Sequence, residues 1–120
     1  MRYNQVEMAT ETYTSLLLQE VISRLANGLQ AEQIYLFGSQ ATNQAGSGSD
    51  YDLLVVVPPT DLPRHKREAL SYDLLWGLTL PVDVIVLTRD EFQRLTQVRT
   101  SLASTAKTRG ILLYGKSKNR

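Results

Sequence analysis

Apolar residues recur at steps of three and four through the first quarter of the chain. This spacing is typical of one face of an amphipathic helix. We predict a helix over residues 8–26 that ends at the Asn27-Gly28 pair, because asparagine and glycine commonly follow a helix C-terminus. The pattern is carried by Leu17, Leu18, Val21, Ile22 and Leu25.

Short apolar runs further along the chain have the composition of β-strands. They read QIYLFG at 33–38, YDLLVVV at 51–57 and PVDVIVL at 81–87. The second run has no polar residue after Asp52, which predicts a strand covered on both faces. A further run, ILLYG at 111–115, predicts a short edge strand.

Further helices are predicted between and after these strands. Pro63 opens a segment over 63–76, and proline is favoured in the first turn of a helix. Thr88 and Glu91 have the spacing of a capping box, so the next helix begins there. A last helix is predicted over 99–109. This order of elements predicts an α/β (α+β) fold in which helices flank a small mixed β-sheet.

Length and composition are those of an ordinary globular protein. The chain has 120 residues, of which 42% are hydrophobic, and this length is typical of one domain. We expect residues 1–115 to form that domain and the basic tail, 116–120, to be disordered. A signal peptide and a membrane-spanning apolar run are both missing from the sequence, so we expect a cytoplasmic protein without membrane association.

The residue types limit the chemistry. Cysteine is absent and histidine occurs once, which excludes thiolate sites and imidazole-rich metal sites. A metal would have to be held by carboxylates, and these prefer hard cations such as Mg²⁺ or Mn²⁺. The net charge is +1, and the basic residues gather at 64–67 and from residue 107 onward. We interpret these clusters as solvated surface rather than as a nucleic-acid site.

Acidic residues stand where two of the predicted strands begin. Side chains two residues apart in a strand point the same way, which places Asp50 with Asp52. Asp83 lies inside the run VDVIV, where an unpaired buried carboxylate is costly. Three carboxylates on neighbouring strands repel one another unless a cation lies between them, and paired divalent ions serve phosphoryl and nucleotidyl transfer. Each aspartate taken alone could instead be a turn or surface residue.

The pair Gly38-Ser39 directly follows the first predicted strand. Glycine allows a ligand to approach the backbone closely. Serine offers a hydroxyl and an N–H group, and free N–H groups at the start of a helical turn favour phosphate. The pair is a weak signal by itself, because the same two residues occur in many loops.

Taken together, these residues spell Gly-Ser, then ten residues, then Asp-x-Asp. This pattern resembles the signature of the DNA polymerase β-like nucleotidyltransferase superfamily, and Asp83 is similar to its third carboxylate. The resemblance implies two Mg²⁺ ions, with Mn²⁺ as an alternative, and a nucleoside triphosphate donor. It further implies that Gly38 and Ser39 hold the triphosphate, that Asp50 and Asp52 bind both metals, and that Asp83 binds the catalytic metal and activates the acceptor hydroxyl.

The resemblance extends over residues 10–114 and is with the minimal nucleotidyltransferases in particular. It implies transfer of a nucleoside monophosphate, expected to be AMP from ATP, to a hydroxyl. Minimal members commonly occur beside a HEPN-domain protein that can be a toxic RNase. There the nucleotidyltransferase resembles an antitoxin that adenylylates a tyrosine of its partner. Tyr72 and Trp76 could join such an interface, although we expect Trp76 to pack in the core.

Two alternatives remain open from the sequence. The domain could neutralise its partner by contact, with little or no catalysis. It could also act on a small molecule, in which case a homodimer could supply the wall that a small acceptor needs. Both are compatible with the same set of aspartates.

One feature departs from the family pattern. Many relatives carry arginine directly after the Gly-Ser pair, whereas residues 40–49 here contain no basic residue. This loop argues against direct nucleic-acid binding, which depends on basic contacts to phosphate. The countercharge for a triphosphate is left to the metals or to a remote cation such as Arg64, Lys66 or Arg67.

Overall fold

The computed structural model describes residues 5–38 and 50–115, with side chains described from residue 15 onward. Its strands form one mixed sheet in the order β3-β2-β1-β4. Strand β1 is antiparallel to β2 and β4, and β2 is parallel to β3. The elements are α1 (Gln5–Leu29), β1 (Gln33–Phe37), β2 (Tyr51–Val57), α2 (Arg64–Leu74), β3 (Val82–Thr88), α3 (Arg89–Thr96), α4 (Leu102–Arg109) and β4 (Ile111–Gly115). The predicted α+β fold with a small mixed sheet is confirmed.

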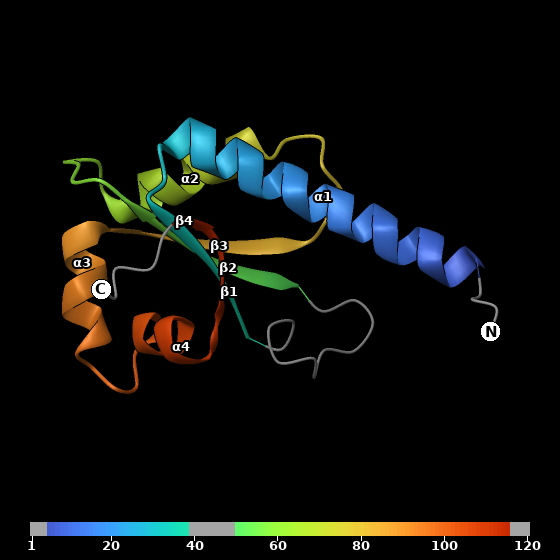
Figure 1. The fold of residues 1–120 in the computed structure, drawn as a ribbon. Helices are drawn as coiled ribbons and strands as arrows, with labels where there is room; N and C mark the ends of the chain where they lie inside the picture. Colours follow the sequence, from blue (N-terminus) through green and yellow to red (C-terminus); the bar gives the residue numbers. More distant parts are fainter. Residues whose placement is uncertain (1–4, 39–49, 116–120) are drawn as a thin grey trace.

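Helices cover both faces of this sheet. In Figure 1, α1 and α2 lie on one face and α3 and α4 on the other. Alternate residues of β2 enter the two cores, with Leu53 and Val55 facing α1 and α2, and Leu54 and Val56 facing α3 and α4. This alternation follows from the period of two in a strand. It confirms that β2 is buried on both faces. Within the described ranges, none of the helices has the length and apolarity needed to cross a membrane.

Several helix boundaries differ from the predicted ones, and the structure gives a reason for two of the differences. Helix α1 continues through Gly28 to Leu29, and Gln30, with φ of 54°, takes the left-handed turn that ends it. Gly28 serves close packing instead, because a Cβ at this position would lie 2.4 Å from Cδ1 of Leu74 in α2. Helix α4 begins at Leu102 rather than near residue 99, because the side chain of Ser101 accepts the Ser104 N–H at 3.0 Å.

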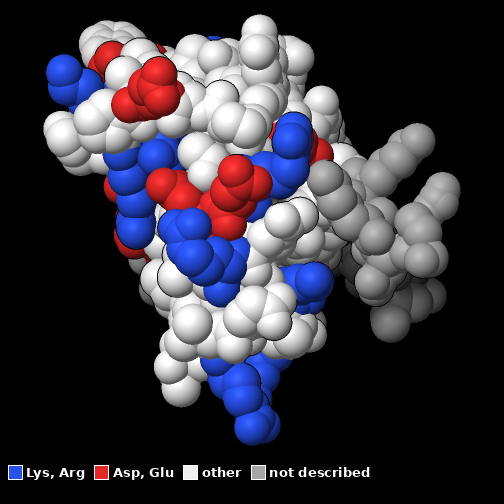
Figure 2. All heavy atoms as spheres, turned by 90° about the vertical axis from the view of Figure 1, so that its left-hand side faces the viewer, with Lys and Arg blue, Asp and Glu red and all other residues white. Residues whose placement is uncertain are grey.

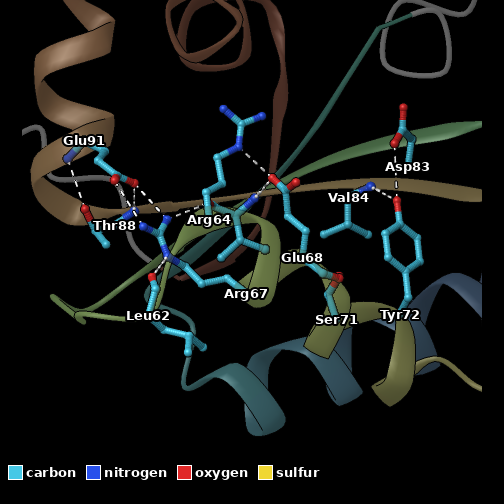
Figure 3. A network of polar contacts seen from close by, with 11 residues as sticks. Leu62, Arg64, Arg67, Glu68, Ser71, Tyr72, Asp83, Val84, Thr88 and Glu91 are labelled. Carbon is cyan, nitrogen blue, oxygen red and sulfur yellow. Dashed lines mark hydrogen bonds and ion pairs between the residues drawn. The ribbon is translucent and has the colours of Figure 1, made fainter.

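Side chains from α2 and α3 accept hydrogen bonds from backbone N–H groups along the open edge of β3 (Figure 3). An unpaired edge strand exposes backbone N–H groups that can pair with other chains. Here every second N–H along the edge has a side-chain acceptor. The pairs are Val84 N with Tyr72 Oη at 2.9 Å, Val86 N with Glu68 Oε2 at 3.1 Å, and Thr88 N with Glu91 Oε1 at 2.9 Å. The last of these belongs to the predicted capping box, which is confirmed.

Arg67 is the buried centre of this edge network, with 7% of the residue exposed. Its guanidinium donates to the carbonyl oxygens of Leu62 and Val86, each at 2.9 Å. It also binds both carboxylate oxygens of Glu91, at 2.8 and 3.1 Å. A buried guanidinium with this many partners has a structural role, since it joins α2, β3 and α3.

Candidate active site

Asp52 and Asp83 lie directly opposite each other in the parallel register of β2 and β3. Both are on the sheet face that α3 and α4 cover, because Leu54 and Ile85, two residues further along each strand, pack in that core. Asp50 is exposed and precedes β2. Asp52 and Asp83 therefore meet where their neighbouring strands begin, as predicted, and Asp50 stands just before β2. The direction of Asp50 does not follow from strand periodicity, because this residue lies outside the strand.

The backbone of Gly38 lies against the carboxylate of Asp52. A Cβ at Gly38 would stand 2.3 Å from Oδ2 of Asp52, so any other residue here would force the Asp52 carboxylate to move. Its φ of 78° is also in the region that favours glycine. The antiparallel register explains the proximity, because Phe37 pairs with Asp52 and Gly38 follows it. Ser39, the other predicted phosphate-binding residue, lies outside the described residues, as does the predicted tail at 116–120.

The carboxylates act on one another electrostatically. Burial, followed by the negative charges of Asp83 and Asp50, raises the pKa of Asp52 above its usual range. All three influences disfavour the charged form of Asp52. A bound cation would reverse this balance, because it would favour the ionised carboxylates.

The arrangement suits a cation that arrives together with a phosphate. Within residues 5–38 and 50–115, no three carboxylate or imidazole side chains converge as a ready-made metal cage. Mg²⁺ is commonly bound by one or two protein carboxylates together with substrate phosphates, rather than by an all-protein cage. Asp52 and Asp83 offer carboxylate oxygens of this kind, and Gly38 leaves the space beside Asp52 free of a side chain. The residues present therefore fit a hard divalent cation.

The α2 segment that carries Arg64, Lys66 and Arg67 is not beside these carboxylates, which argues against the alternative that one of these cations supplies the countercharge. Helix α2 begins beside the end of β3, where Arg67 contacts Val86, and it ends beside Asp83. The reason is the antiparallel packing of α2 on β3. Figure 2 shows the far end of the molecule, where basic and acidic side chains are interleaved. The ion pairs there include Arg64 with Glu68, Arg67 with Glu91, and Arg89 with Glu32.

A different cation is placed at the carboxylate end of the sheet. Ile111, the first residue of β4, pairs with Leu36. The preceding Gly110 is so close to β1 that a Cβ there would lie 2.8 Å from the Leu36 carbonyl oxygen. Arg109, exposed in the last turn of α4, is therefore level with the end of β1 that leads into Gly38. The sequence analysis missed this residue, because the pairing of segments 75 positions apart has no local signal.

Tyr72 touches Asp83 from the last turns of α2 (Figure 3). Its hydroxyl accepts the Val84 N–H at 2.9 Å and donates to Oδ1 of Asp83 at 3.3 Å. Burial, assisted by the charge of Asp83 and opposed by the Val84 N–H, raises the pKa of Tyr72. The hydroxyl therefore keeps its proton at neutral pH and can donate it in a hydrogen bond.

Trp76 lies on the surface with 82% of the residue exposed, so the expected core packing is wrong. Its neighbour Leu75 occupies the core position instead. Arg24 of α1 fixes the turn that follows α2. Its guanidinium donates to the carbonyl oxygens of Trp76 at 3.2 Å and Leu74 at 3.3 Å. Gly77 then reverses the chain with φ of 87°. The indole is thus presented to solvent by an anchored backbone.

The chain is similar to known proteins along most of its length. Residues 17–113 match a family model described as a nucleotidyltransferase domain. A candidate nucleotidyltransferase from Sulfolobus solfataricus has a similar structure, with a TM-score of 0.64 and 22% identity over 98% of this chain and 95% of that chain. A search of curated proteins finds no match.

Two further solved structures come from toxin–antitoxin complexes. A chain in a toxin–antitoxin crystal structure with AMP-PNP has a TM-score of 0.61 and 26% identity, over 82% of this chain and 73% of that chain. A chain in a variant of the MntA-HpeT toxin–antitoxin has a TM-score of 0.56 and 26% identity, over 82% and 72% of the two chains.

Proposed function

This chain belongs to the nucleotidyltransferase domain family, and we propose that it transfers AMP from ATP to a hydroxyl of a partner protein, as the antitoxin of a toxin–antitoxin pair. The observation that carries the proposal is the facing pair Asp52 and Asp83, with the Gly38 backbone against Asp52. These residues combine a place for divalent cations with a place for phosphate. No covalent enzyme intermediate is needed for this reaction.

Each residue has a distinct role in the proposed reaction. Asp50 and Asp52 would bind Mg²⁺, and Gly38 and Ser39 would hold the triphosphate. Asp83 would bind the catalytic Mg²⁺ and would take the proton of the acceptor hydroxyl. The acceptor oxygen then forms a bond to the α-phosphorus of ATP. At the same time, the bond between the α-phosphorus and the oxygen that links it to the β-phosphate breaks, so pyrophosphate leaves. The two Mg²⁺ ions would neutralise phosphate charge and lower the pKa of the acceptor.

A partner protein is the acceptor that the surface supports best. We propose a tyrosine of a HEPN-domain toxin, in line with the similarity to a chain from a toxin–antitoxin complex with AMP-PNP. Trp76 and Tyr72 are exposed, and Tyr72 contacts Asp83. Large aromatic side chains dominate the binding energy of many protein interfaces. An aromatic surface beside the proposed base is therefore suited to a partner that brings its own hydroxyl to the site.

The test uses the purified chain, ATP labelled in the α-phosphate, Mg²⁺ and the product of the neighbouring gene. We expect label on the partner with the wild-type chain and none with Asp52→Asn or Asp83→Asn. Asp61→Asn is the matched control, because Asp61 is exposed in the turn before α2 and far from the other two aspartates. Labelling that survives both active-site substitutions would contradict the proposal, as would the absence of labelling by the wild type.

A second candidate function is neutralisation of the partner by contact alone. It is favoured by the position of the α2 cations, which lie at the end of the sheet away from Asp52 and Asp83. Under this function, the Asp52→Asn variant would still bind the partner and inhibit its toxicity. Neither the wild-type chain nor this variant would label the partner. Under the first function, the substitution would remove labelling and inhibition together.

A further inference from the structure

The hydroxyl of Tyr72 joins two groups on adjacent residues of β3. It accepts the backbone N–H of Val84 at 2.9 Å and lies 3.3 Å from Oδ1 of Asp83. Val84 is on the outer edge of the sheet, because β3 pairs only with β2 in the described sheet. Tyr72 therefore contacts the exposed carboxylate of Asp83 at the open edge of the sheet.

The direction of the Tyr72 proton follows from this geometry. A phenolic oxygen has one proton to donate and can accept through its lone pairs. The Val84 N–H occupies an accepting position, so the O–H bond must point elsewhere. Among the described residues, the acceptor within reach is Oδ1 of Asp83. The carboxylate consequently has one oxygen held by Tyr72 and the other left for a ligand.

The helix that carries this hydroxyl is itself held in place by residues before Tyr72. Ser71, the residue before Tyr72 in α2, is fully buried, and its hydroxyl donates to the Glu68 carbonyl oxygen at 2.6 Å. Arg67, one turn earlier, ties the same helix to β3 and α3. The part of α2 that precedes Tyr72 is thus fixed against β3 by the buried side chains of Arg67 and Ser71 (Figure 3).

We propose that Tyr72 is a positioning residue for Asp83, which fixes the carboxylate so that its free oxygen faces Asp52 and the acceptor. This inference rests on the proposed function, in which Asp83 binds the cation and takes the acceptor proton. Groups that hydrogen-bond to a metal-binding side chain orient it, and removing such a group commonly reduces metal affinity or activity by about 10- to 100-fold.

The test compares Tyr72→Phe with Glu68→Ala. Each substitution leaves one β3 edge N–H, of Val84 or of Val86, without its side-chain acceptor, but only the first also releases Asp83. For Tyr72→Phe we expect kcat for partner labelling to fall by about 10-fold, with KM for ATP within about twofold of the wild type. Mn²⁺ binding, followed by electron paramagnetic resonance with a non-hydrolysable ATP analogue present, should weaken in parallel. Glu68→Ala should leave kcat and Mn²⁺ binding near wild-type values.

The outcomes separate this inference from the function on which it rests. Equal losses in both variants would assign Tyr72 a purely structural role at the sheet edge and would overturn the proposal. Wild-type kinetics and Mn²⁺ binding in Tyr72→Phe would also overturn it, while the proposed transfer would stand. If the wild-type chain itself neither binds Mn²⁺ nor labels the partner, the proposed function fails and the positioning role fails with it.

Discussion

Asp52 and Asp83 face each other in register across the parallel strands β2 and β3, on the same face of the sheet. Burial and the charges of Asp83 and Asp50 raise the pKa of Asp52. Burial and these two charges all disfavour the ionised form of the Asp52 carboxylate. The native fold therefore carries an electrostatic cost at the site where we place the chemistry, as expected where function opposes stability.

Asp52→Asn should stabilise the metal-free protein while it abolishes transfer. The amide removes a charge that burial and two neighbours disfavour, and such relief of a strained site typically raises stability by about 0.5–2 kcal/mol. Urea unfolding in the presence of EDTA measures the change. Mg²⁺ with a non-hydrolysable ATP analogue should raise the Tm of the wild type and leave that of the variant unchanged. Asp73→Asn, an exposed change on α2, is the control. It should neither stabilise the metal-free protein nor remove the rise in Tm with Mg²⁺ and the ATP analogue. A lower stability of Asp52→Asn would contradict the expected repulsion.

Gly38→Ala should disrupt the site more than its backbone strain alone would predict. A side chain at a φ of 78° costs about 1 kcal/mol of stability. The added Cβ would also lie 2.3 Å from Oδ2 of Asp52 and would therefore displace this carboxylate. Gly77→Ala provides the matched control, because its φ is 87° and no atom lies within 4 Å of the added Cβ. Both variants should lose similar stability in urea, but only Gly38→Ala should lose transfer. Full activity in Gly38→Ala would show that the contact with Asp52 is not needed.

The parts of the structure that were predicted correctly are those with local signals. The strands follow from apolar runs, and the start of α3 follows from the spacing of Thr88 and Glu91. The gathering of Asp52 and Asp83 could be predicted because both residues stand where their strands begin. Each of these features follows from where a residue stands within its own predicted helix or strand.

The remaining features depend on packing between distant segments. Arg67 resembles a surface cation in the sequence, yet it is buried because Glu91 and the carbonyl oxygens of two other segments surround it. Trp76 resembles a core residue, but the turn after α2 directs Leu75 inward in its place. The contact of Tyr72 with Asp83 requires the antiparallel placement of α2 on β3, which no local pattern specifies.

The Arg67–Glu91 pair should make stability depend on pH in the acidic range. Hydrogen bonds from Arg67, opposed by burial and supported by Thr88, lower the pKa of Glu91 from 4.5 to about 2. The pKa of Glu91 is lower in the folded protein than in the unfolded chain. The stability contributed by its pair with Arg67 is therefore complete above the unfolded pKa and is lost as the pH falls from about 5 towards 2. With 30% of the Glu91 side chain exposed, solvent screening reduces the expected contribution to about 1–2 kcal/mol.

Glu91→Gln tests this assignment in urea unfolding between pH 7 and pH 3. The variant should be less stable than the wild type at pH 7, and the difference should shrink as the pH falls. Glu20→Gln is the control, because Glu20 forms an exposed pair with Arg24 and should show little difference at either pH. A difference between Glu91→Gln and wild type that stays constant with pH would exclude Glu91 as the titrating group.

Arg109→Ala should weaken the interaction with the triphosphate. The β1–β4 register places Arg109 at the end of the sheet that carries Gly38 and Asp52, and a guanidinium there can neutralise phosphate charge. We expect KM for ATP to rise by about 10-fold, equivalent to one charge-assisted hydrogen bond of about 1.4 kcal/mol. Arg64→Ala removes a cation from the opposite end of the sheet and should leave KM unchanged. A larger effect from Arg64→Ala than from Arg109→Ala would reverse this assignment.

Trp76→Ala should weaken recognition of the partner protein without affecting the fold. The residue is 82% exposed, so its removal should change the free energy of unfolding by less than about 0.5 kcal/mol. A tryptophan at the centre of an interface commonly contributes about 2 kcal/mol or more, so the KM for the partner should rise by about 30-fold. The KM for ATP should stay the same, because the Trp76 turn is anchored on Arg24 rather than on the carboxylates. Val98→Ala, an exposed apolar change between α3 and α4, is the control. If Trp76→Ala labels the partner with wild-type kinetics, the partner docks on another surface.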